Sequence, residues 1–483
     1  MNTVCIYDNH IFPSVFISNI VGNKKFSEII IRRESVEKKF ADFVKKINEI
    51  ENIIFFNNEG QLEEIKNYIR SLPGKTRIVH VFSNEIIADK EKAKIFFQKA
   101  GYVNENYVWL DNKGSVTSFM MADGFEYCDF IDKNHDKLSD GESYRAFESF
   151  REVKTDVFCD ISEYSNFLRY ISGGFDSRFF NSINNNGYTL VKASKNKKKI
   201  KMEYSLYNFL PEDMKPWFVM PYGYTENDET ASYTMKSYRI PDMAIRWVHD
   251  AVGIDEFDNF LRIIFTFVNN RHSRPISEGD YERMQHEAYV TKVEERIKEL
   301  ESHPLYPELK HLLPCDDYIS KLYERYMHMY NNNKEQCSRI SVVGHGDLCF
   351  SNILFDKNTE LLKLIDPRGA LSEQELWMDP YYDIAKLSHS ICGYYDYFNN
   401  GLYRIEVDSD LKLHLEIEAD NTVYIERFKN YVQENGYSYK LVRIYESSLF
   451  LSMLPLHMDN PHKVLGFILN ADRILSSIEE MEL

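Results

Sequence analysis

The chain has 483 residues, 43% of them apolar and 14% aromatic, which is enough for two or three globular domains with sizeable cores. Its net charge of −17 leaves no basic surplus to neutralise phosphates, which argues against a general nucleic-acid-binding protein. Seven scattered cysteines without a CxxC pair argue against a disulfide framework or a structural zinc site and favour a reducing compartment. Because neither a signal peptide nor a membrane-length apolar run is visible, we expect a cytoplasmic protein without a membrane span.

The first part of the chain alternates between short apolar runs and helix-like segments. The runs that we predict as buried strands cover residues 4–7, 29–31, 53–56 and 78–82. Residues 35–50 and 92–100 place their apolar side chains on one helical face. This pattern predicts an α/β, Rossmann-like domain over residues 1–155, with a mostly parallel sheet and a role that the sequence leaves open. Asp8 and His10 follow the first strand, where such sheets bind ligands, although ordinary loop polarity explains them as well.

The next part has the pattern of an antiparallel small lobe, which we assign to residues 156–238. Residues 167–171, 188–194 and 232–238 are predicted strands, and residues 200–210 a helix between the last two. Asn186-Gly187 favours a tight turn before the second strand, because both residues tolerate positive φ. Residues 239–483 are mostly helical; around 255–271 the apolar positions keep helical spacing and form a core face.

The stretch ISGGFDSRFF, residues 171–180, has two incompatible interpretations. Its SGGFDS resembles the pyrophosphate-binding loop of ATP pyrophosphatases, which would make the chain an adenylating or amide-forming enzyme. Alternatively, Gly173 and Gly174 form a glycine-rich turn over ATP phosphates, where the absence of a Cβ lets the backbone approach. Local patterning excludes neither, because residues 178–187 could form the helix that a pyrophosphatase needs.

The strongest chemical signal is VVGHGDLCFSNILFDKNTELLKLIDPRGA, residues 342–370. Two short apolar strands frame a polar loop that carries His345, Asp347 and Asn352, and Asp366 follows the second strand. The D-x-x-x-x-N spacing is that of a kinase catalytic loop. Asp347 is the candidate catalytic base and His345 a second candidate catalytic residue. Asn352 and Asp366 offer the hard oxygen ligands that suit Mg²⁺.

HGDLCFSNILF, followed by LIDPRG and DPYYDIAKL, resembles the aminoglycoside phosphotransferase and choline kinase superfamily. The resemblance covers roughly residues 160–483 and implies a two-lobed, protein-kinase-like α+β fold that phosphorylates small molecules. It implies Asp347 as the catalytic base, Asn352 and Asp366 as magnesium ligands, and a structural role for Asp383. Arg368 departs from the usual residue after the metal aspartate, and we expect it to pair with a carboxylate such as Glu375.

A kinase small lobe also needs a lysine for the α- and β-phosphates and a helical glutamate that holds it. Lys192 in TLVKAS and Glu203 on the following helix occur in that order. We predict nucleotide-binding residues on the glycine turn, two strands and the helix of the small lobe. They are Gly173, Gly174, Lys192, Glu203, Met235, Lys236 and Ser237. The last three belong to a hinge strand whose backbone could meet adenine.

We therefore expect an ATP- and Mg²⁺-dependent kinase acting on a small-molecule alcohol, with the adenylating enzyme and a non-catalytic kinase-like binding protein as alternatives. The kinase with an added N-terminal domain resembles bacterial proteins linked to capsule or surface-polysaccharide biosynthesis. That resemblance favours a sugar acceptor, with choline or another amino alcohol second. Aromatic residues and Asp396 in SHSICGYYDYF suit a quaternary ammonium group, or simply pack between helices. The oligomeric state is not indicated by the sequence.

Overall fold

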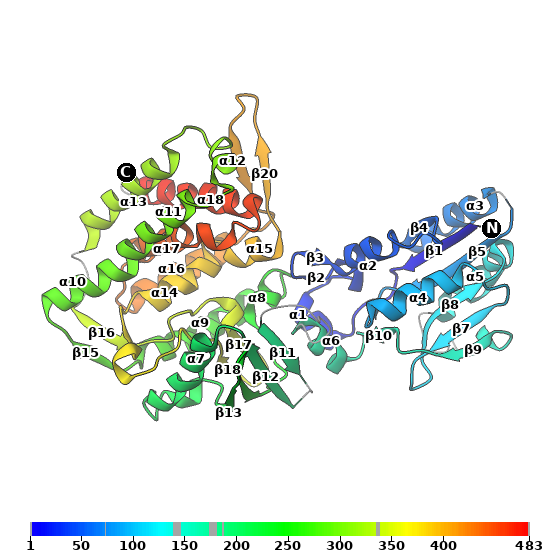
Figure 1. Ribbon diagram of the computed structural model, residues 1–483, viewed down its shortest axis with the longest axis horizontal. Coiled ribbons are helices and arrows are strands. Elements are labelled where there is room, and N and C mark those ends of the chain that lie inside the picture. The colour runs from blue at the N-terminus through cyan, green and yellow to red at the C-terminus, as the bar shows by residue number, and fades with distance from the viewer. Residues whose placement is uncertain are drawn as a thin grey trace. The chain divides into compact units, whose positions relative to one another are not determined.

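The computed structural model describes residues 2–72, 74–138, 146–172, 181–185, 188–334 and 339–481 (Figure 1). The chain forms two compact units: unit 1 comprises residues 1–176 and 249–251, and unit 2 comprises residues 177–248 and 252–483. Residues 156–176 belong to unit 1 because strand β10 (Phe158–Asp160) pairs with β6 (Glu85–Ile87) of that unit. The division at residue 176 therefore lies later than the predicted boundary at 155.

Unit 1 contains a six-stranded sheet with helices on both faces. Besides β6 and β10, the strands of unit 1 are β1 (Asn2–Asp8), β2 (Ile30–Ile31), β3 (Glu34–Ser35), β4 (Asn52–Phe56), β5 (Thr76–Phe82), β7 (Tyr107–Leu110), β8 (Val116–Met121) and β9 (Arg151–Lys154). Its helices are α1 (Val15–Val21), α2 (Val36–Val44), α3 (Leu62–Ser71), α4 (Lys90–Ala100), α5 (Gly124–Leu138) and α6 (Tyr164–Ile171). The sheet order is β4-β1-β5-β8-β7-β9.

The sheet of unit 1 is mostly parallel, as predicted. β1 is parallel to both β4 and β5, and β7 is parallel to β9, whereas β8 runs antiparallel to its neighbours β5 and β7. The predicted strand at residues 29–31 becomes β2, which pairs only with β3 in a separate two-stranded sheet. Two residues are too few to extend a sheet, so this apolar run serves the core instead, where Ile29 is fully buried.

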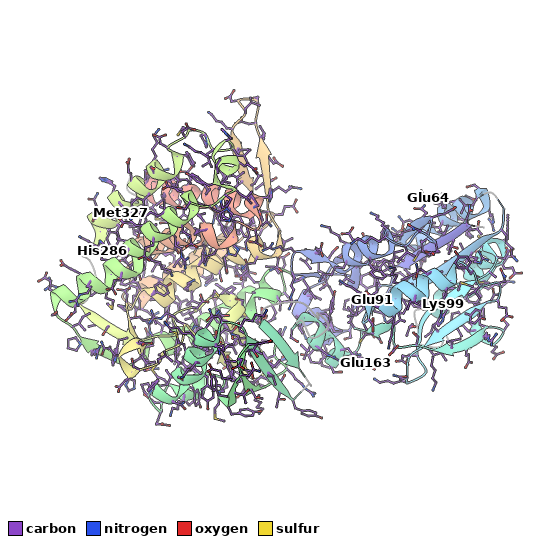
Figure 2. The ribbon with its side chains drawn as sticks, in the orientation of Figure 1. Glu64, Glu91, Lys99, Glu163, His286 and Met327 are labelled. Carbon is purple, nitrogen blue, oxygen red and sulfur yellow. The ribbon has the colours of Figure 1, made fainter. Side chains whose placement is uncertain are left out.

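Two apolar layers hold the sheet between its helices. One packs α3 and α5 against β1 and β5, and the other packs α2 and α4 against the opposite face. Helix α4 shows how the sequence sets this arrangement: Ala93 and Phe97 are buried at helical spacing, while Glu91 and Lys99 are exposed (Figure 2).

The segment 167–171 was predicted as a strand, and this was wrong, because it belongs to helix α6. A run of five residues is too short for periodicity to separate a strand from a helix. In the structure Phe167 and Leu168 are buried while Tyr164 is exposed, which is the pattern of a short amphipathic helix. Helix α6 packs with α1 inside unit 1.

Unit 2 begins with an antiparallel four-stranded sheet in the order β11-β12-β14-β13. Its strands are β11 (Asn181–Asn185), β12 (Thr189–Ser194), β13 (Pro221–Glu226) and β14 (Ala231–Lys236). Helix α7 (Lys197–Phe209) connects β12 to the rest of this small lobe and packs on β12, β13 and β14. The predicted strands at 188–194 and 232–238 and the predicted helix at 200–210 are confirmed.

The rest of unit 2 is a mostly helical large lobe. Its helices are α8 (Met243–Trp247), α9 (Ile254–Asn269), α10 (Glu278–His286), α11 (Lys292–Glu301), α12 (Tyr306–Lys310), α13 (Tyr318–Asn333), α14 (Tyr382–Ile391), α15 (Tyr395–Asn400), α16 (Thr422–Glu434), α17 (Tyr439–Met453) and α18 (Pro461–Glu480). Its strands are β15 (Ser273–Pro275), β16 (Ile340–Val343), β17 (Ile353–Asp356), β18 (Leu361–Leu364), β19 (Trp377–Met378), β20 (Arg404–Val407) and β21 (Leu413–Glu416).

One large apolar core joins the helices of this lobe. Every apolar position that predicts the face of α9 is buried, including Phe257, Phe260 and Phe265. The small antiparallel sheet on a helix, followed by a helical lobe with the β17–β18 hairpin, is a two-lobed kinase-like architecture, as predicted. Within the described ranges, none of the helices has the length and hydrophobicity needed to cross a bilayer.

Candidate active site

The polar loop of residues 344–352 lies between two small sheets of the large lobe. Strand β16 enters it from a three-stranded sheet with β15 and β19, and the antiparallel hairpin β17–β18 leaves it. Asp366 is the second residue after the end of β18. The N–H of the intervening Ile365 donates to the carbonyl of Asn352 at 3.0 Å. The predicted hairpin is therefore confirmed, and it brings the loop and Asp366 to the same end.

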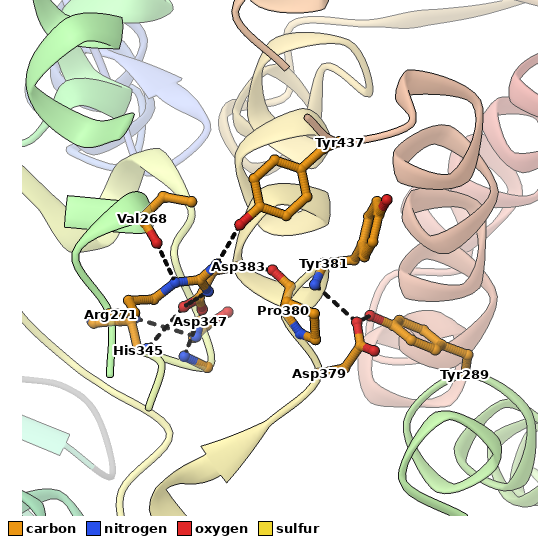
Figure 3. A network of polar contacts seen from close by, with 11 residues as sticks. Val268, Arg271, Tyr289, His345, Asp347, Asp379, Pro380, Tyr381, Asp383 and Tyr437 are labelled. Carbon is orange, nitrogen blue, oxygen red and sulfur yellow. Dashed lines mark hydrogen bonds and ion pairs between the residues drawn. The ribbon is translucent and has the colours of Figure 1, made fainter. Parts of the chain in front are cut away.

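Asp383 braces the loop from the first turn of α14. Its carboxylate accepts the N–H of His345 at 2.9 Å and the N–H of Gly346 at 2.7 Å, and it pairs with Arg271 at 3.1 Å (Figure 3). The side chains of Asp383 and Arg271 are both completely buried. Arg271 also donates to the carbonyls of Val268 and Pro380 at 2.9 Å, so the pair connects α9, the loop and the start of α14.

A second buried carboxylate supports the segment that leads into α14. Asp379 accepts hydrogen bonds from the hydroxyl of Tyr289 at 2.8 Å and from the N–H of Tyr381 at 2.9 Å (Figure 3). It also accepts a hydrogen bond from Gln285 at 2.9 Å. Burial raises the pKa of Asp379, and these three donors oppose that effect. The segment between β19 and α14 is thereby fixed from the side of α10 as well.

The ring of His345 is used by the backbone of the loop. Nε2 lies 2.9 Å from the carbonyl of Ile365, and the N–H of Asp347 donates to Nδ1 at 3.2 Å. Since a carbonyl only accepts, the ring must carry its proton on Nε2. His345 is fully buried and stacks on Phe218, with ring centroids 5.8 Å apart. This geometry gives His345 the means to hold Asp347 next to the β18 end.

Asp347 lies in a ring of partners that leaves its carboxylate partly exposed. The amide nitrogen of Asn352 donates to the carbonyl of Asp347 at 2.8 Å and to its Oδ2 at 3.1 Å. The ammonium group of Lys386 lies 3.0 Å from Oδ1. Burial alone would raise the pKa of Asp347, but Lys386 outweighs burial and the pKa is lowered. Asp347 is therefore an ionised acceptor at neutral pH.

Lys192 connects the small lobe to the other carboxylate of the site. Its ammonium group lies 2.7 Å from Glu203 of α7 and 2.8 Å from Asp366. Burial opposes the charged form of this lysine, but the two carboxylates outweigh it and raise its pKa. Tyr233 of β14 donates its hydroxyl to Glu203 at 3.1 Å, which fixes the carboxylate from the opposite strand. The predicted Lys192–Glu203 pair is thus formed.

The loop after β18 has a special backbone and docks on α7. Asp366 has φ of +53°, an uncommon left-handed conformation that Asp tolerates better than most residues and that is often retained at functional sites. Gly369 has φ of +88°, and a Cβ there would lie 2.7 Å from the carbonyl carbon of Met202. The N–H of Ala370 donates to the carbonyl of Met202 at 3.0 Å. The loop of Asp366 and the helix of Glu203 therefore hold each other in place.

The other predicted nucleotide residues fall in three environments. Met235 is buried and its backbone is paired on both sides, with Leu190 and with Pro221, while Lys236 is exposed at the strand end. The N–H of Ser237 donates to the carbonyl of Tyr188 at 2.9 Å. The backbone of Met235 and Ser237 is thus engaged in the sheet. Gly173 and Gly174, like the turn at Asn186-Gly187, lie outside the described residues.

A pocket opens beside the Lys192 ion pairs. Its walls come from α7, β14, the segment before β13 and the end of β18, and they include Tyr207, Phe218, Tyr233, Met235, Asp366 and Pro367. The pocket reaches the Asp366 carboxylate from an apolar side. It therefore lies where the two lobes of unit 2 meet.

The residues present fit the predicted magnesium ion. Asn352 uses its amide nitrogen for Asp347, so its carbonyl oxygen is the atom that suits a hard cation, and Asp366 supplies a charged oxygen. No group of three or more His, Cys, Asp or Glu side chains suited to a metal occurs in the described part of the chain. A set of one carboxylate and one amide agrees with an ion that completes its shell with phosphate oxygens and water.

Two further predictions meet a different environment in the structure. Arg368 does not pair with the carboxylate of Glu375; it donates to the backbone carbonyl of Glu375 at 2.9 Å, and the carboxylate accepts the N–H of Leu371. Asp396 is buried, which raises its pKa to about 7, and His389 is fully buried between Tyr395 and Phe450. The packing alternative therefore describes this segment better than an exposed cation cage.

Lys386 and Tyr233 are site residues that the sequence did not reveal. Lys386 stands three residues after Asp383 on the same helix, so a helical wheel would have placed it on the face that meets the loop. Tyr233 shares one face of β14 with the buried Ala231 and Met235, which marks the inner face of the sheet. Neither pattern identifies a site residue until the partner segment is known, which is the catalytic loop for Lys386 and helix α7 for Tyr233.

Replacing Arg271 with Met is expected to lower the free energy of unfolding of unit 2 by ~3–5 kcal/mol, because it leaves the buried Asp383 carboxylate without its charged partner. Denaturant unfolding of the full chain measures the change. Arg262→Met is the matched control: its partner Glu360 and Arg262 itself are more than half exposed, and such pairs contribute ~1 kcal/mol or less. Equal effects of the two variants would contradict the assigned role of the buried pair.

Replacing Gly369 with Ala is expected to separate the Asp366 loop from α7, because the new Cβ meets the backbone of Met202 and Glu203. Gly436→Ala is the matched control, since Gly436 has a similar φ of +80° and no atom near the added Cβ. Both variants carry the backbone strain of about 1 kcal/mol, but only Gly369→Ala should weaken binding of an ATP analogue, as titration calorimetry would show. Unchanged binding in Gly369→Ala would refute the coupling.

By sequence, no family model and no characterised protein matches the chain. Solved structures do match: aminoglycoside 2'-phosphotransferase-IIIa with GDP, at 14% identity and a TM-score of 0.38 over 64% of this chain and 92% of that one. Aminoglycoside phosphotransferase APH(4)-Ia with ADP and hygromycin B is 12% identical, with a TM-score of 0.38 over 65% of this chain and 98% of that one. A putative fructosamine-3-kinase from Haemophilus somnus is 11% identical, with a TM-score of 0.36 over 65% of this chain and 96% of that one. At these values the likeness carries no weight of its own, and the kinase-like fold of unit 2 rests on its own sheet, hairpin and ion pairs.

Proposed function

We propose that unit 2 is an ATP- and Mg²⁺-dependent phosphotransferase that phosphorylates a hydroxyl group of a small molecule. The observation that carries this proposal is the single cluster in which Lys192 joins Glu203 to Asp366, next to the Asp347–Asn352 pair. Phosphoryl transfer requires mainly an oriented hydroxyl and neutralised phosphate charge, and this cluster contains groups for both tasks.

ATP is the substrate that the small lobe would hold. The ammonium group of Lys192, kept charged by its two carboxylates, suits the α- and β-phosphates. Leu190 of β12 and Leu354 and Ile365 of the large lobe are partly buried members of one apolar cluster, and they suit the two faces of adenine. Because Met235 and Ser237 already use their backbone in the sheet, we place the hinge contact in the residues that follow.

Asn352 and Asp366 would hold Mg²⁺, which when bound supplies positive charge to the phosphate oxygens. In the structure Asp366 is oriented by Lys192 at 2.8 Å and by its own left-handed backbone. Asn352 is oriented through its amide nitrogen. Both oxygen donors are thus set by protein contacts alone.

Asp347 is the proposed base for the acceptor hydroxyl. Lys386 keeps its carboxylate ionised, and Asn352 fixes the rotation of that carboxylate. An ionised carboxylate accepts the hydrogen bond of the hydroxyl and then its proton as the oxygen attacks. We assign His345 a positioning role at this step, because both ring nitrogens face backbone groups rather than the carboxylate.

The adenylating alternative loses its local support in the small lobe. A pyrophosphatase loop needs a helix next, but residues 181–185 form β11, which pairs antiparallel with β12. The non-catalytic alternative has no missing side chain to support it, since Lys192, Asp347, Asn352 and Asp366 are all in place. For the acceptor we keep a sugar or sugar-linked alcohol first and an amino alcohol second, and a role in surface-polysaccharide synthesis remains part of this proposal.

Asp347→Asn is expected to lower kcat by ~10²–10⁴, because it removes the base, and Asp366→Ala should abolish magnesium-dependent turnover. The measurement is ADP and phosphorylated product formed with a panel of sugars, amino alcohols and aminoglycosides. Asp410→Asn, on the exposed turn between β20 and β21, is the matched control and should behave as wild type. Formation of AMP and pyrophosphate, or full activity in both site variants, would overturn the proposal.

Lys386→Met is expected to move the acid limb of the kcat/KM profile to higher pH. Lys386 lowers the pKa of Asp347, so without it the base becomes protonated, and activity falls, at a higher pH than in wild type. Lys386→Arg retains a cation at the same place and should restore most of the wild-type profile. An unmoved acid limb in Lys386→Met would show that this lysine has only a structural role.

A further inference from the structure

The sheet of unit 1 reverses its strand order at β1. The chain passes from β1 to β4 on one side and then returns to β5 on the other, and all three strands are parallel. Crevices at such a reversal, outside the carboxyl ends of the strands, are where open α/β sheets bind ligands. In this chain the segments at that edge are residues 8–10 at the end of β1 and residues 83–85 after β5.

A network of hydrogen bonds forms the floor of this edge. Asp8 is fully buried, and its carboxylate contacts the ring of His10 and lies 2.9 Å from Nε2 of His80. Nδ1 of His80 lies 3.0 Å from the hydroxyl of Tyr127. Although burial opposes it, hydrogen bonding to the two histidines lowers the pKa of Asp8 to about 2. The N–H of Ser83 donates to the carbonyl of Asp8 at 2.7 Å, which ties the two segments together.

Four neighbouring polar side chains have an atom that no described residue satisfies. These atoms are Oδ1 of Asn9, Oγ of Ser83, Oδ1 of Asn84 and Oε2 of Glu85. The four residues are between 0% and 9% exposed. A buried polar group without a partner costs about 1–3 kcal/mol, so four at one sheet edge call for an explanation.

The orientation of the two asparagines is set by their other ends. Nδ2 of Asn9 donates to Asn57 at 3.0 Å, and Nδ2 of Asn84 donates to Asp160 at 2.8 Å. Each amide is therefore anchored through its nitrogen and presents its oxygen. The two amide oxygens can only accept hydrogen bonds. The Ser83 hydroxyl and the Glu85 carboxyl, whose pKa burial raises well above its ordinary value, can also donate, so the set suits a ligand with several hydroxyl groups.

Two exposed aromatic rings occur a few residues after Asn9 and Asp160 in the sequence. Phe16 of α1 and Tyr164 of α6 are 72% and 40% exposed, and their ring centroids are 6.3 Å apart. Tyr164 comes shortly after Asp160 and Ser162, which are bonded to each other. Exposed aromatic rings offer a surface for flat or ring-shaped ligands.

We propose that the carboxyl edge of β1 and β5 in unit 1 binds an uncharged, hydroxyl-bearing ring, either a free sugar or the ribose of a nucleoside. Its hydroxyl groups would donate to Asn9 and Asn84 and exchange hydrogen bonds with Ser83 and Glu85, and its apolar face would lie on the aromatic pair. A free phosphate fits less well, because its unprotonated oxygens would face the amide oxygens of Asn9 and Asn84 and the carboxylates of Asp8 and Asp160. The site is independent of the phosphotransferase proposed for unit 2.

The test is titration calorimetry of the full chain with monosaccharides, with nucleosides and with inorganic phosphate. A saturating non-hydrolysable ATP analogue keeps nucleosides out of unit 2. The variants are Ser83→Ala and Glu85→Met, which remove polar atoms without a protein partner. The matched control is Thr76→Val, because Thr76 also buries an unsatisfied hydroxyl but at the opposite, amino end of β5. Thermal unfolding checks that all variants fold, which we expect since no protein hydrogen bond of these atoms is lost.

We expect one hydroxylated ring to bind wild type and Thr76→Val alike and to bind Ser83→Ala and Glu85→Met at least about fivefold more weakly. If only nucleosides bind, the ribose is the ligand group; if only monosaccharides bind, it is a sugar. The proposal is overturned by the absence of binding at millimolar concentrations, by equal affinity in all four proteins, or by binding of phosphate alone. None of these outcomes depends on whether unit 2 transfers phosphate.

Discussion

The candidate active site depends on one buried carboxylate, that of Asp383. It collects two backbone N–H groups of the catalytic loop and the guanidinium of Arg271 in a place that water does not reach. A buried charge is tolerated only when its partners are well placed, so the contacts that neutralise Asp383 also fix the loop. Without this constraint Asp347 would be held only by its contacts with His345, Asn352 and Lys386.

A second constraint joins the two lobes of unit 2 through Lys192. Its ammonium group is shared by Glu203, which belongs to the small lobe, and Asp366, which belongs to the large lobe. Gly369 adds a close backbone contact between the same two parts. The position of α7 and the position of the Asp366 loop are therefore coupled, and a nucleotide that attracts Lys192 to its phosphates would act on both at once. The left-handed backbone of Asp366 agrees with a residue held for function rather than for local stability.

The sequence predicted those parts of the site that lie on strongly patterned elements. Lys192, Glu203, Asp347, Asn352 and Asp366 follow one another along the chain in strands, a helix and a hairpin, so spacing alone identified them. Their partners could not be predicted in the same way, because Arg271 lies 112 residues before Asp383 and Lys386 acquires its meaning only from the packing of α14 on the loop. Short apolar runs were the weak point: residues 167–171 fit a strand or a helix equally, and only packing with α1 decided for a helix.

Two different lysines pair with the two key carboxylates of unit 2. Lys192 serves the carboxylate proposed to bind metal and Lys386 serves the carboxylate proposed to act as base, and neither Asp366 nor Asp347 contacts the other's lysine among the described ion pairs. Such a separation lets Lys386, on α14, lower the pKa of Asp347 without acting through Lys192 or Asp366. Asp347 is therefore ionised in the structure without any contribution from a bound nucleotide. The base is then ready before the substrates assemble, which is what a pre-organised transfer site requires.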